Sequence, residues 1–251
     1  MRLVRAEMLK LVRRRGTIIW SAVLTIGAVV VTEAIVIGLH AFNPDHHGPA
    51  GGLVNFDHVV SVIGALGSIA AIILGSAAGS QDVSAGVFRD LVVTGRPRKT
   101  LFNVRLPGAL AVFLPLLGIA FAIAAVCAYA FAGDLRTPSG GDVAHYAAYL
   151  LAINTVNLAI AIGLTAFLSS RVVVGVLIAW NAVVGPLLTN IHALGGARKL
   201  VDVAAAEHFI PQVDQSTNRI AMSTGSALLV LVVWLTLFLL AGRFWTERRD
   251  A

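Results

Sequence analysis

The sequence LPGALAVFLPLLGIAFAIAAVCAYAFA, residues 106–132, contains no charged side chain. A membrane-spanning helix needs about 20 consecutive, mostly apolar residues. Within a bilayer the backbone must satisfy its own hydrogen bonds, and a helix does so. We therefore predict that this stretch crosses a membrane as a helix. Six runs of this kind occur in the chain, at Thr17–Leu39, Val59–Ser80, Leu106–Ala132, Val143–Leu168, Val172–Ile191 and Ala227–Gly242.

The composition agrees with a membrane protein. The chain of 251 residues is 57% hydrophobic and 13% charged, whereas soluble domains carry about 25% charged residues. We predict an all-α membrane protein, with residues 17–251 forming one six-span domain. The single cysteine, Cys127, excludes an intramolecular disulfide and a cysteine-based metal cluster.

The distribution of Lys and Arg predicts the orientation. Of the 19 cations, fifteen fall in segments on one side of the predicted spans and four on the other. Because short cytoplasmic loops carry the excess of Lys and Arg, we expect both termini to face the cytoplasm. The net charge of +6 is thus explained by the excess of Lys and Arg on one side of a membrane. We therefore expect no nucleic-acid partner.

Residues 1–16 precede the first span and have the pattern of a basic amphipathic helix. Apolar residues recur on one helical face, at Val4, Met8, Leu11 and Val12, and cations occupy the rest. Such a helix lies in the headgroup layer, where its cations favour the anionic cytoplasmic leaflet. A simple anchor at the start of the first span is the alternative.

Small residues recur along the second span. Ala71, Gly75 and Gly79 repeat at four-residue intervals, and Gly64 and Ser68 extend the pattern. Such a face lets another helix approach closely. We expect packing within the bundle; a sliding contact or an interface between subunits is the alternative.

Several catalytic motifs are absent from the sequence. No Gly-Lys pair occurs, so there is no Walker-type phosphate loop, and there is neither a Gly-x-Ser-x-Gly elbow nor a His-Glu-x-x-His helix. We expect a chain that is not an enzyme and carries no cofactor. The cluster around Asp45, His46 and His47 lacks a spacing that fixes metal geometry, and we expect no metal there.

The richest polar loop is QDVSAGVFRDLVVTGRPRKTLFNVR, residues 81–105. Ser84 is placed to cap a short helix that extends to about Val93, and Gly95 with Pro97 would stop it. Its apolar side would carry Val87 and Leu91. We expect this helix to bind a cytoplasmic partner, or alternatively to lie on the membrane surface.

The pattern Asp82-x-x-x-Gly86-x-x-Arg89, followed by Gly95-Arg96-Pro97-Arg98, resembles the loop after the second span of ABC type-2 permeases, the membrane subunits of ATP-binding cassette exporters. The layout of the whole chain is similar to that family. The resemblance implies that Ser84–Val93 is a coupling helix that docks on an ATPase subunit. It implies a coupling role for these residues: Asp82, Ser84, Gly86, Val87, Phe88, Arg89, Asp90, Leu91, Arg96 and Arg98.

The same resemblance implies an assembly in the cell (plasma) membrane. Two permeases, identical or paralogous, would face each other with the substrate path between them, and two ATPase subunits would carry ATP and Mg. Residues 1–16 would be the interfacial elbow helix, and residues 192–225 would form short outer helices that partly re-enter the membrane. The apolar spans favour an amphipathic substrate, such as a drug, an antibiotic, a peptide or a lipid-like compound.

Four polar residues inside the spans are candidates for the substrate path. A charged carboxylate at the middle of a span costs about 2.5–3.5 kcal/mol, so Glu33 is either a cavity-facing group or a neutral, packed acid. His40 lies seven residues further along the same helical face and would permit a partial pairing. The amides are weaker candidates, because such groups often bond neighbouring helices: Asn154, Asn157 and Asn181.

Two other classes of function remain open at this point. A membrane anchor or accessory subunit would use the same cytoplasmic loop to dock a partner, without any transport path. A membrane-embedded enzyme would need several polar groups that converge at one depth, and the sequence offers only scattered ones.

Overall fold

The computed structural model describes residues 2–44, 46–86, 93, 95, 97–210 and 220–248. Every regular element in its described part is a helix, and that part contains no strand. Six helical segments are long and apolar enough to cross a membrane, which confirms the number of spans that the sequence predicts and makes the chain a multi-pass membrane protein. They are Arg15–Phe42, Gly52–Asp82, Arg98–Ala130, Gly140–Leu164, Ser170–Asn190 and Thr224–Arg248.

The first and second spans follow a separate N-terminal helix. Helix α1 covers Arg2–Arg13, and the non-helical Arg14 separates it from the first span. The first span joins α2 (Arg15–Ala22), a π-helical segment η1 (Val23–Gly27) and α3 (Ala28–Phe42). The second span is one long helix, α4 (Gly52–Ser84).

The remaining spans contain several breaks. Helix α6 (Arg98–Asn103) precedes α7 (Arg105–Ala130), and α8 covers Gly140–Leu164. The fifth span joins α9 (Ser170–Ala179), a π-helical segment η2 (Trp180–Val184) and α10 (Gly185–Asn190). Then follow a 3₁₀ segment η3 (His192–Leu200), the short helix α11 (Asp202–Glu207) and α12 (Thr224–Arg248).

Local hydrogen bonds extend some helices beyond the predicted apolar runs. Helix α8 begins before Val143 because Ser139 and Asp142 form a capping box, in which the Ser139 backbone donates to the Asp142 carboxylate at 2.9 Å. Helix α12 continues beyond Gly242, where Arg243 and Glu247 pair one turn apart at 2.9 Å. The sixth span is therefore longer than the predicted run Ala227–Gly242 and is long enough to cross a bilayer.

Helices α4 and α8 form the centre of the bundle. Within the most apolar window of each span, 67% of the residues are buried in α4 and in α8, against 17–28% in the other four spans. Helices α7 and α9 pack on α4, and α12 packs on α8. The outer spans therefore leave apolar faces for lipid or for other chains.

The small-residue face of α4 packs against α8 within the chain. A Cβ atom at Gly75 would lie 2.7 Å from the Leu158 carbonyl oxygen, and the Ser68 hydroxyl lies within hydrogen-bond reach of Asn157. A second close approach joins α8 to α12, where a Cβ at Gly242 would lie 2.8 Å from the Gly163 oxygen. These contacts show that the small residues of α4 pack within the bundle, as we expected from the sequence pattern.

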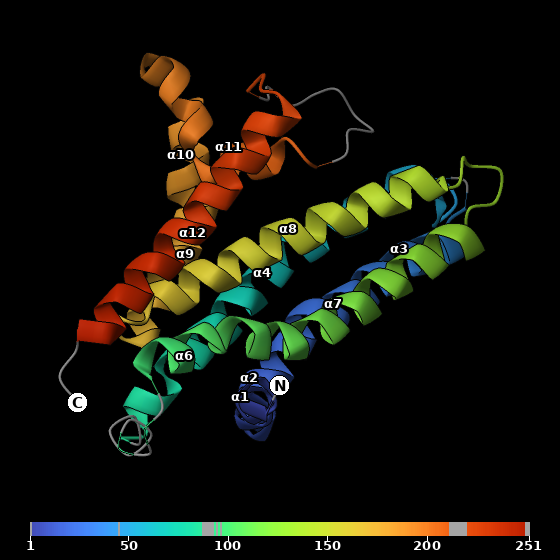
Figure 1. Ribbon diagram of the computed structural model, residues 1–251. Coiled ribbons are helices and arrows are strands. Elements are labelled where there is room, and N and C mark those ends of the chain that lie inside the picture. The colour runs from blue at the N-terminus through green and yellow to red at the C-terminus, as the bar shows by residue number, and fades with distance from the viewer. Residues whose placement is uncertain are drawn as a thin grey trace.

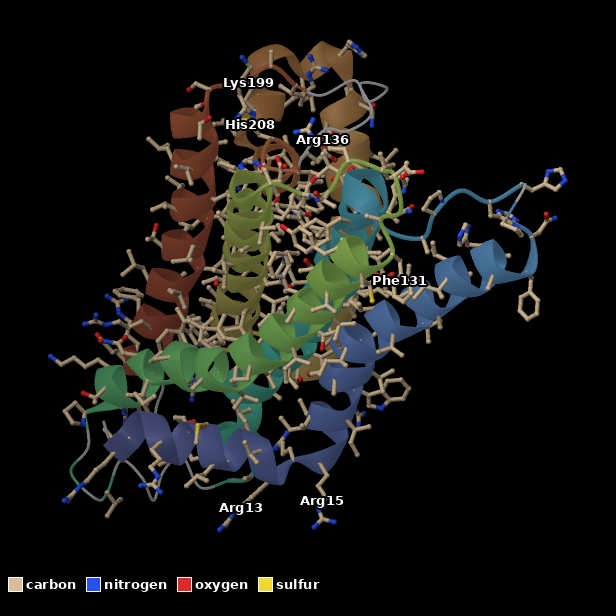
Figure 2. All side chains as sticks on the ribbon, turned by 90° about the vertical axis from the view of Figure 1, so that its right-hand side faces the viewer. Arg13, Arg15, Phe131, Arg136, Lys199 and His208 are labelled. Atoms are coloured by element: carbon tan, nitrogen blue, oxygen red, sulfur yellow. The ribbon has the colours of Figure 1, made fainter. Side chains whose placement is uncertain are left out.

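The helices fan out from the end of the bundle that holds α1 and the last turns of α12 (Figure 1). Arg13 and Arg15 lie at this end, whereas Arg136, Lys199 and His208 lie at the opposite one (Figure 2). We call these the basic end and the far end. At the far end lie the short helices η3 and α11, and Val201, Ala204 and Ala205 are buried. Residues 211–219 of the predicted outer segment 192–225 lie outside the described residues.

Candidate functional site

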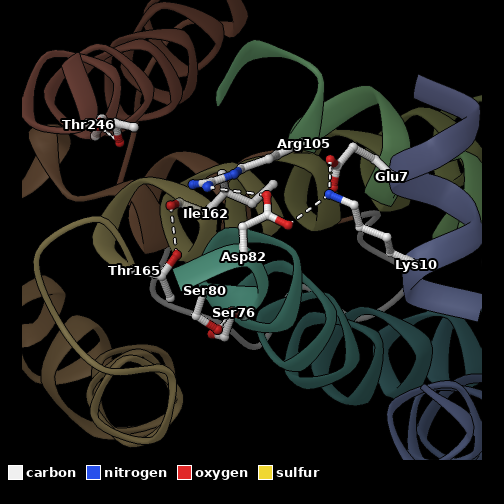
Figure 3. Close-up of polar contacts among 10 residues, drawn as sticks. Glu7, Lys10, Ser76, Ser80, Asp82, Arg105, Ile162, Thr165 and Thr246 are labelled. Carbon is white, nitrogen blue, oxygen red and sulfur yellow. Dashed lines mark hydrogen bonds and ion pairs between the residues drawn. The ribbon is translucent and has the colours of Figure 1, made fainter. Parts of the chain in front are cut away.

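A cluster of four charged side chains lies at the basic end, where α1, α4 and α7 meet (Figure 3). Lys10 of α1 donates to Glu7 Oε1 at 2.6 Å and to Asp82 Oδ1 at 2.8 Å. On the other side of Asp82, Arg105 Nη2 lies 3.9 Å from Oδ2. We call these four residues the basic-end cluster. It holds two acids and two bases, so the charges balance.

The basic-end cluster is buried deeply enough for its pairing to matter. Arg105 and Asp82 are each 2% exposed and Glu7 is 5% exposed. Removing charges from water is costly unless they are paired. The Nε and Nη2 atoms of Arg105 make no hydrogen bond in the described part of the chain. The ion pair with Asp82 is therefore the main interaction that offsets the cost of burying the Arg105 charge.

The two cluster residues on α1 respond differently to this environment. Burial raises the pKa of the Glu7 carboxyl above its ordinary value, although Lys10 opposes the shift. Burial lowers the pKa of the Lys10 ammonium, but its hydrogen bonds to Asp82 and Glu7 outweigh that effect, and the pKa is raised. Lys10 is therefore charged at neutral pH, and it links the N-terminal helix to α4.

The position of the cluster along the chain is its most informative property. Asp82 lies two residues before α4 ends, and Arg105 is the first residue of α7. The pair thus joins the two ends of the segment that connects α4 to α7. Helix α1 can approach α7 because Gly108 has no side chain, and a Cβ there would lie 2.6 Å from that of Glu7.

The structure changes the expected start of the coupling segment. The prediction of a helix that begins at Ser84 is wrong, because Ser84 is the last residue of α4 and Gly86 follows with a φ of +71°. A positive φ favours glycine and ends a helix. The second span extends beyond the predicted Ser80 because Lys10 and Arg105 neutralise Asp82, which the hydropathy pattern reads as a loop residue.

The other predicted coupling residues are only partly placed. Asp82 is buried inside the chain, so it faces Lys10 and Arg105 rather than a partner surface. Arg98, the first residue of α6, donates to the backbone oxygen of Glu247 at 3.2 Å and ties the loop to the end of α12. The remaining predicted residues lie outside the described ones: Val87, Phe88, Arg89, Asp90, Leu91 and Arg96.

Glu7, Lys10 and Arg105 were not among the candidate residues that the sequence predicts. A signal was present for two of them: Glu7 is the only acid in residues 2–13, and Lys10 follows it by three positions on the same helical face. Nothing local indicates Arg105, because its partner Asp82 precedes it by a whole loop.

A second feature is a cavity of about 360 Å³ between α4, α8, the fifth span and α11. Ala65 and Ala182 line it and keep exposed side chains, so the cavity is open. Its wall on α4 extends from Ser61 to Ile72, which corresponds to about 16 Å of helix at 1.5 Å per residue. Most of its lining is apolar, and Asn181 and Glu207 are among its polar members.

Two tryptophans hold α11 over the cavity. Trp180 of η2 donates from its indole nitrogen to the Asp202 carboxylate at 2.9 Å, and Trp234 of α12 donates to the Leu200 oxygen at 2.9 Å. The two rings pack with centroids 5.5 Å apart. Burial raises the pKa of Asp202 above its ordinary value. The far end is thus tied to the fifth and sixth spans.

The three predicted amides are brought to the side of the bundle where this cavity lies, but only one of them lines it. Asn181 donates to Asn157 Oδ1 at 3.0 Å, and Asn157 donates to the Ser68 hydroxyl at 3.3 Å. Asn154 is buried one turn away and donates to the Leu150 oxygen at 2.7 Å. Asn154 and Asn157 thus bond neighbouring groups, whereas Asn181 also reaches the cavity.

Glu33 is separate from this cavity. It lies on α3 with 5% exposure and makes no hydrogen bond or ion pair within the described ranges. The suggested pairing with His40 is not formed, because the His40 ring contacts the His47 oxygen at 2.7 Å. Across the described residues, no group of three or more His, Cys, Asp or Glu could hold a metal; Asp45 lies outside them.

No known protein-family model matches the sequence, and no curated protein is significantly similar to it.

Proposed function

We propose that this chain is the permease subunit of an ATP-binding cassette transporter that exports an amphipathic substrate. ATP would be bound, with Mg, and hydrolysed by two copies of a separate ATPase subunit. A second permease, identical or paralogous, would complete the path. The basic end would face the cytoplasm of the cell, with the bundle in the plasma membrane.

The observation that carries the proposal is the basic-end cluster. A partner that moves the loop between α4 and α7 would act on Asp82 and Arg105, which bound it. Lys10 extends this connection to α1, so the loop, two spans and the N-terminal helix are one mechanical unit. Such a unit suits a membrane subunit that receives movement from an external motor.

The open cavity among four elements supports transport over simple anchoring. An anchor needs only apolar spans that pack well. Helices α4 and α8 and the fifth span leave an unfilled cavity between them, and polar groups line this cavity at membrane depth. A polar group that faces such a space as well as a neighbouring helix, as Asn181 does, suits a ligand or substrate path.

Copurification tests the proposal directly. The chain is tagged, extracted from its native membrane and purified, and we expect a nucleotide-binding protein in stoichiometric amount. In the reconstituted complex, deletion of residues 84–93 should leave basal ATPase activity and abolish its stimulation by substrate, together with transport. Unchanged transport after this deletion would refute the coupling role. A copurified partner without a nucleotide site would favour the anchor or accessory subunit instead.

A further inference from the structure

The cavity lies within a single chain, not between two permeases. Its walls come from α4, α8, the segments α9, η2 and α10, and α11. Pockets that bind small molecules are mostly apolar with a few convergent polar groups, at volumes of about 300–1,000 Å³. This cavity, at about 360 Å³, matches that description.

Asn181, which lines this cavity, is the first polar group of interest. Its amide nitrogen donates to Asn157 Oδ1 and to the Leu177 oxygen, which uses both of its N–H groups. Its Oδ1 atom accepts no hydrogen bond in the described part of the chain. Asn181 also lies in the π-helical segment η2, and such segments occur often at functional sites.

The second polar group of interest is the Glu207 carboxylate at the end of α11. It takes part in another interaction. A carboxylate offers about four lone-pair sites, however, so it can accept a ligand donor in addition. The cavity lining includes no Lys, Arg or His among the described residues. Acceptors without competing cations favour a ligand that carries a donor and a positive charge.

We propose that this cavity binds one amphipathic cation. The apolar body of the ligand packs against Ile69, Ile72 and Ile153, and its ammonium group donates to Asn181 Oδ1 and Glu207. Binding of such a molecule is a property of the single chain. That the bound molecule is the exported substrate rests on the proposed function.

Monodansylcadaverine is a suitable probe, because it joins an apolar fluorophore to a primary amine. Titration into nanodiscs of the purified protein in phosphatidylcholine, a lipid without net charge, should give a saturable rise in fluorescence. The neutral N-acetyl derivative should bind at least tenfold more weakly. If it binds equally well, or if neither probe saturates, the proposal is wrong.

Two adjacent substitutions locate the site. Ala182→Phe fills the cavity and should raise the Kd of the amine at least tenfold, whereas Val183→Phe, at an exposed position outside the lining, should change it less than twofold. Glu207→Gln should also weaken binding of the amine but leave the neutral derivative unaffected. Ala65→Phe on the opposite wall replaces Ala182→Phe if that variant does not fold. Equal affinities for the filled-cavity and Val183→Phe variants would overturn the location.

These measurements separate the inference from the proposed function. They use the chain without any partner, so failure of the permease proposal would appear as the absence of a copurified ATPase while amine binding persists. Failure of the cavity proposal would appear as amine binding that does not saturate, in a chain that still copurifies with the ATPase.

Discussion

Replacing Lys10 by Met should release α1 from the bundle. The change removes the donor that contacts Glu7 at 2.6 Å and Asp82 at 2.8 Å, and leaves Glu7, which is 5% exposed, without its cation. Removing one partner of a buried pair costs about 3–5 kcal/mol. Because the Lys10 side chain is 29% exposed, and Asp82 retains Arg105, we expect a smaller loss, about 2–3 kcal/mol.

Hydrogen exchange in nanodiscs measures this loss locally. A change of about 2–3 kcal/mol in the opening free energy lowers the protection of the α1 amides about 30- to 150-fold, since 1.4 kcal/mol is a factor of ten. Arg5→Met is the matched control, because it removes the same charge from an exposed position of the same helix. Glu7→Leu combined with Lys10→Met should recover part of the protection, because no unpaired acid is then left on α1.

Equal protection in Lys10→Met and Arg5→Met would refute this reasoning. It would mean that α1 is held by its apolar contacts with α7, and that the charges contribute nothing measurable. The cluster would then not transmit movement from the loop to α1.

Three other predictions concern the cluster, the packing and the orientation. Burial raises the pKa of Glu7 and Lys10 opposes this shift, so the Glu7 pKa should rise further in Lys10→Met. Because an acid with a raised pKa in the folded state stabilises that state at low pH, the hydrogen-exchange protection of α1 in this variant should recover as the pH falls from 8 to 5. A deficit in protection that stays constant over this pH range would contradict the prediction. Gly75→Ala should lower the stability in detergent by about 1–3 kcal/mol through overpacking against α8, whereas Gly118→Ala, with open space around it, should not; equal melting temperatures would count against the close α4–α8 contact. In a Cys127→Ser background, a membrane-impermeant maleimide should label Gly196→Cys but not Gly95→Cys in intact cells; the reverse pattern would invert the assigned orientation.

The number of spans could be predicted because each depends only on a local run of apolar residues. The ends of the spans were harder, since they depend on whether a polar side chain finds a partner. Asp82 reads as a loop residue in isolation, yet it belongs to α4 because Lys10 and Arg105 neutralise it. The Ser139 and Asp142 capping box was readable from the sequence but lay outside the apolar runs.

The candidate sites were predicted less completely for the same physical reason. Asn157 and Asn181 could be named as polar residues in apolar runs, but their mutual hydrogen bond and the cavity beside them depend on how the fifth span packs against α8. The contact between Lys10 and Asp82 joins distant parts of the sequence. No periodicity within one helix contains that information.

The buried pair of Asp82 and Arg105 also constrains how the protein is made. An arginine that enters the membrane region alone carries an insertion penalty, and so does an isolated aspartate. Because the two residues lie near the facing ends of α4 and α7, the penalty of each falls when these helices enter the bilayer together as a helical hairpin. The second and third spans should therefore leave the insertion machinery as a pair.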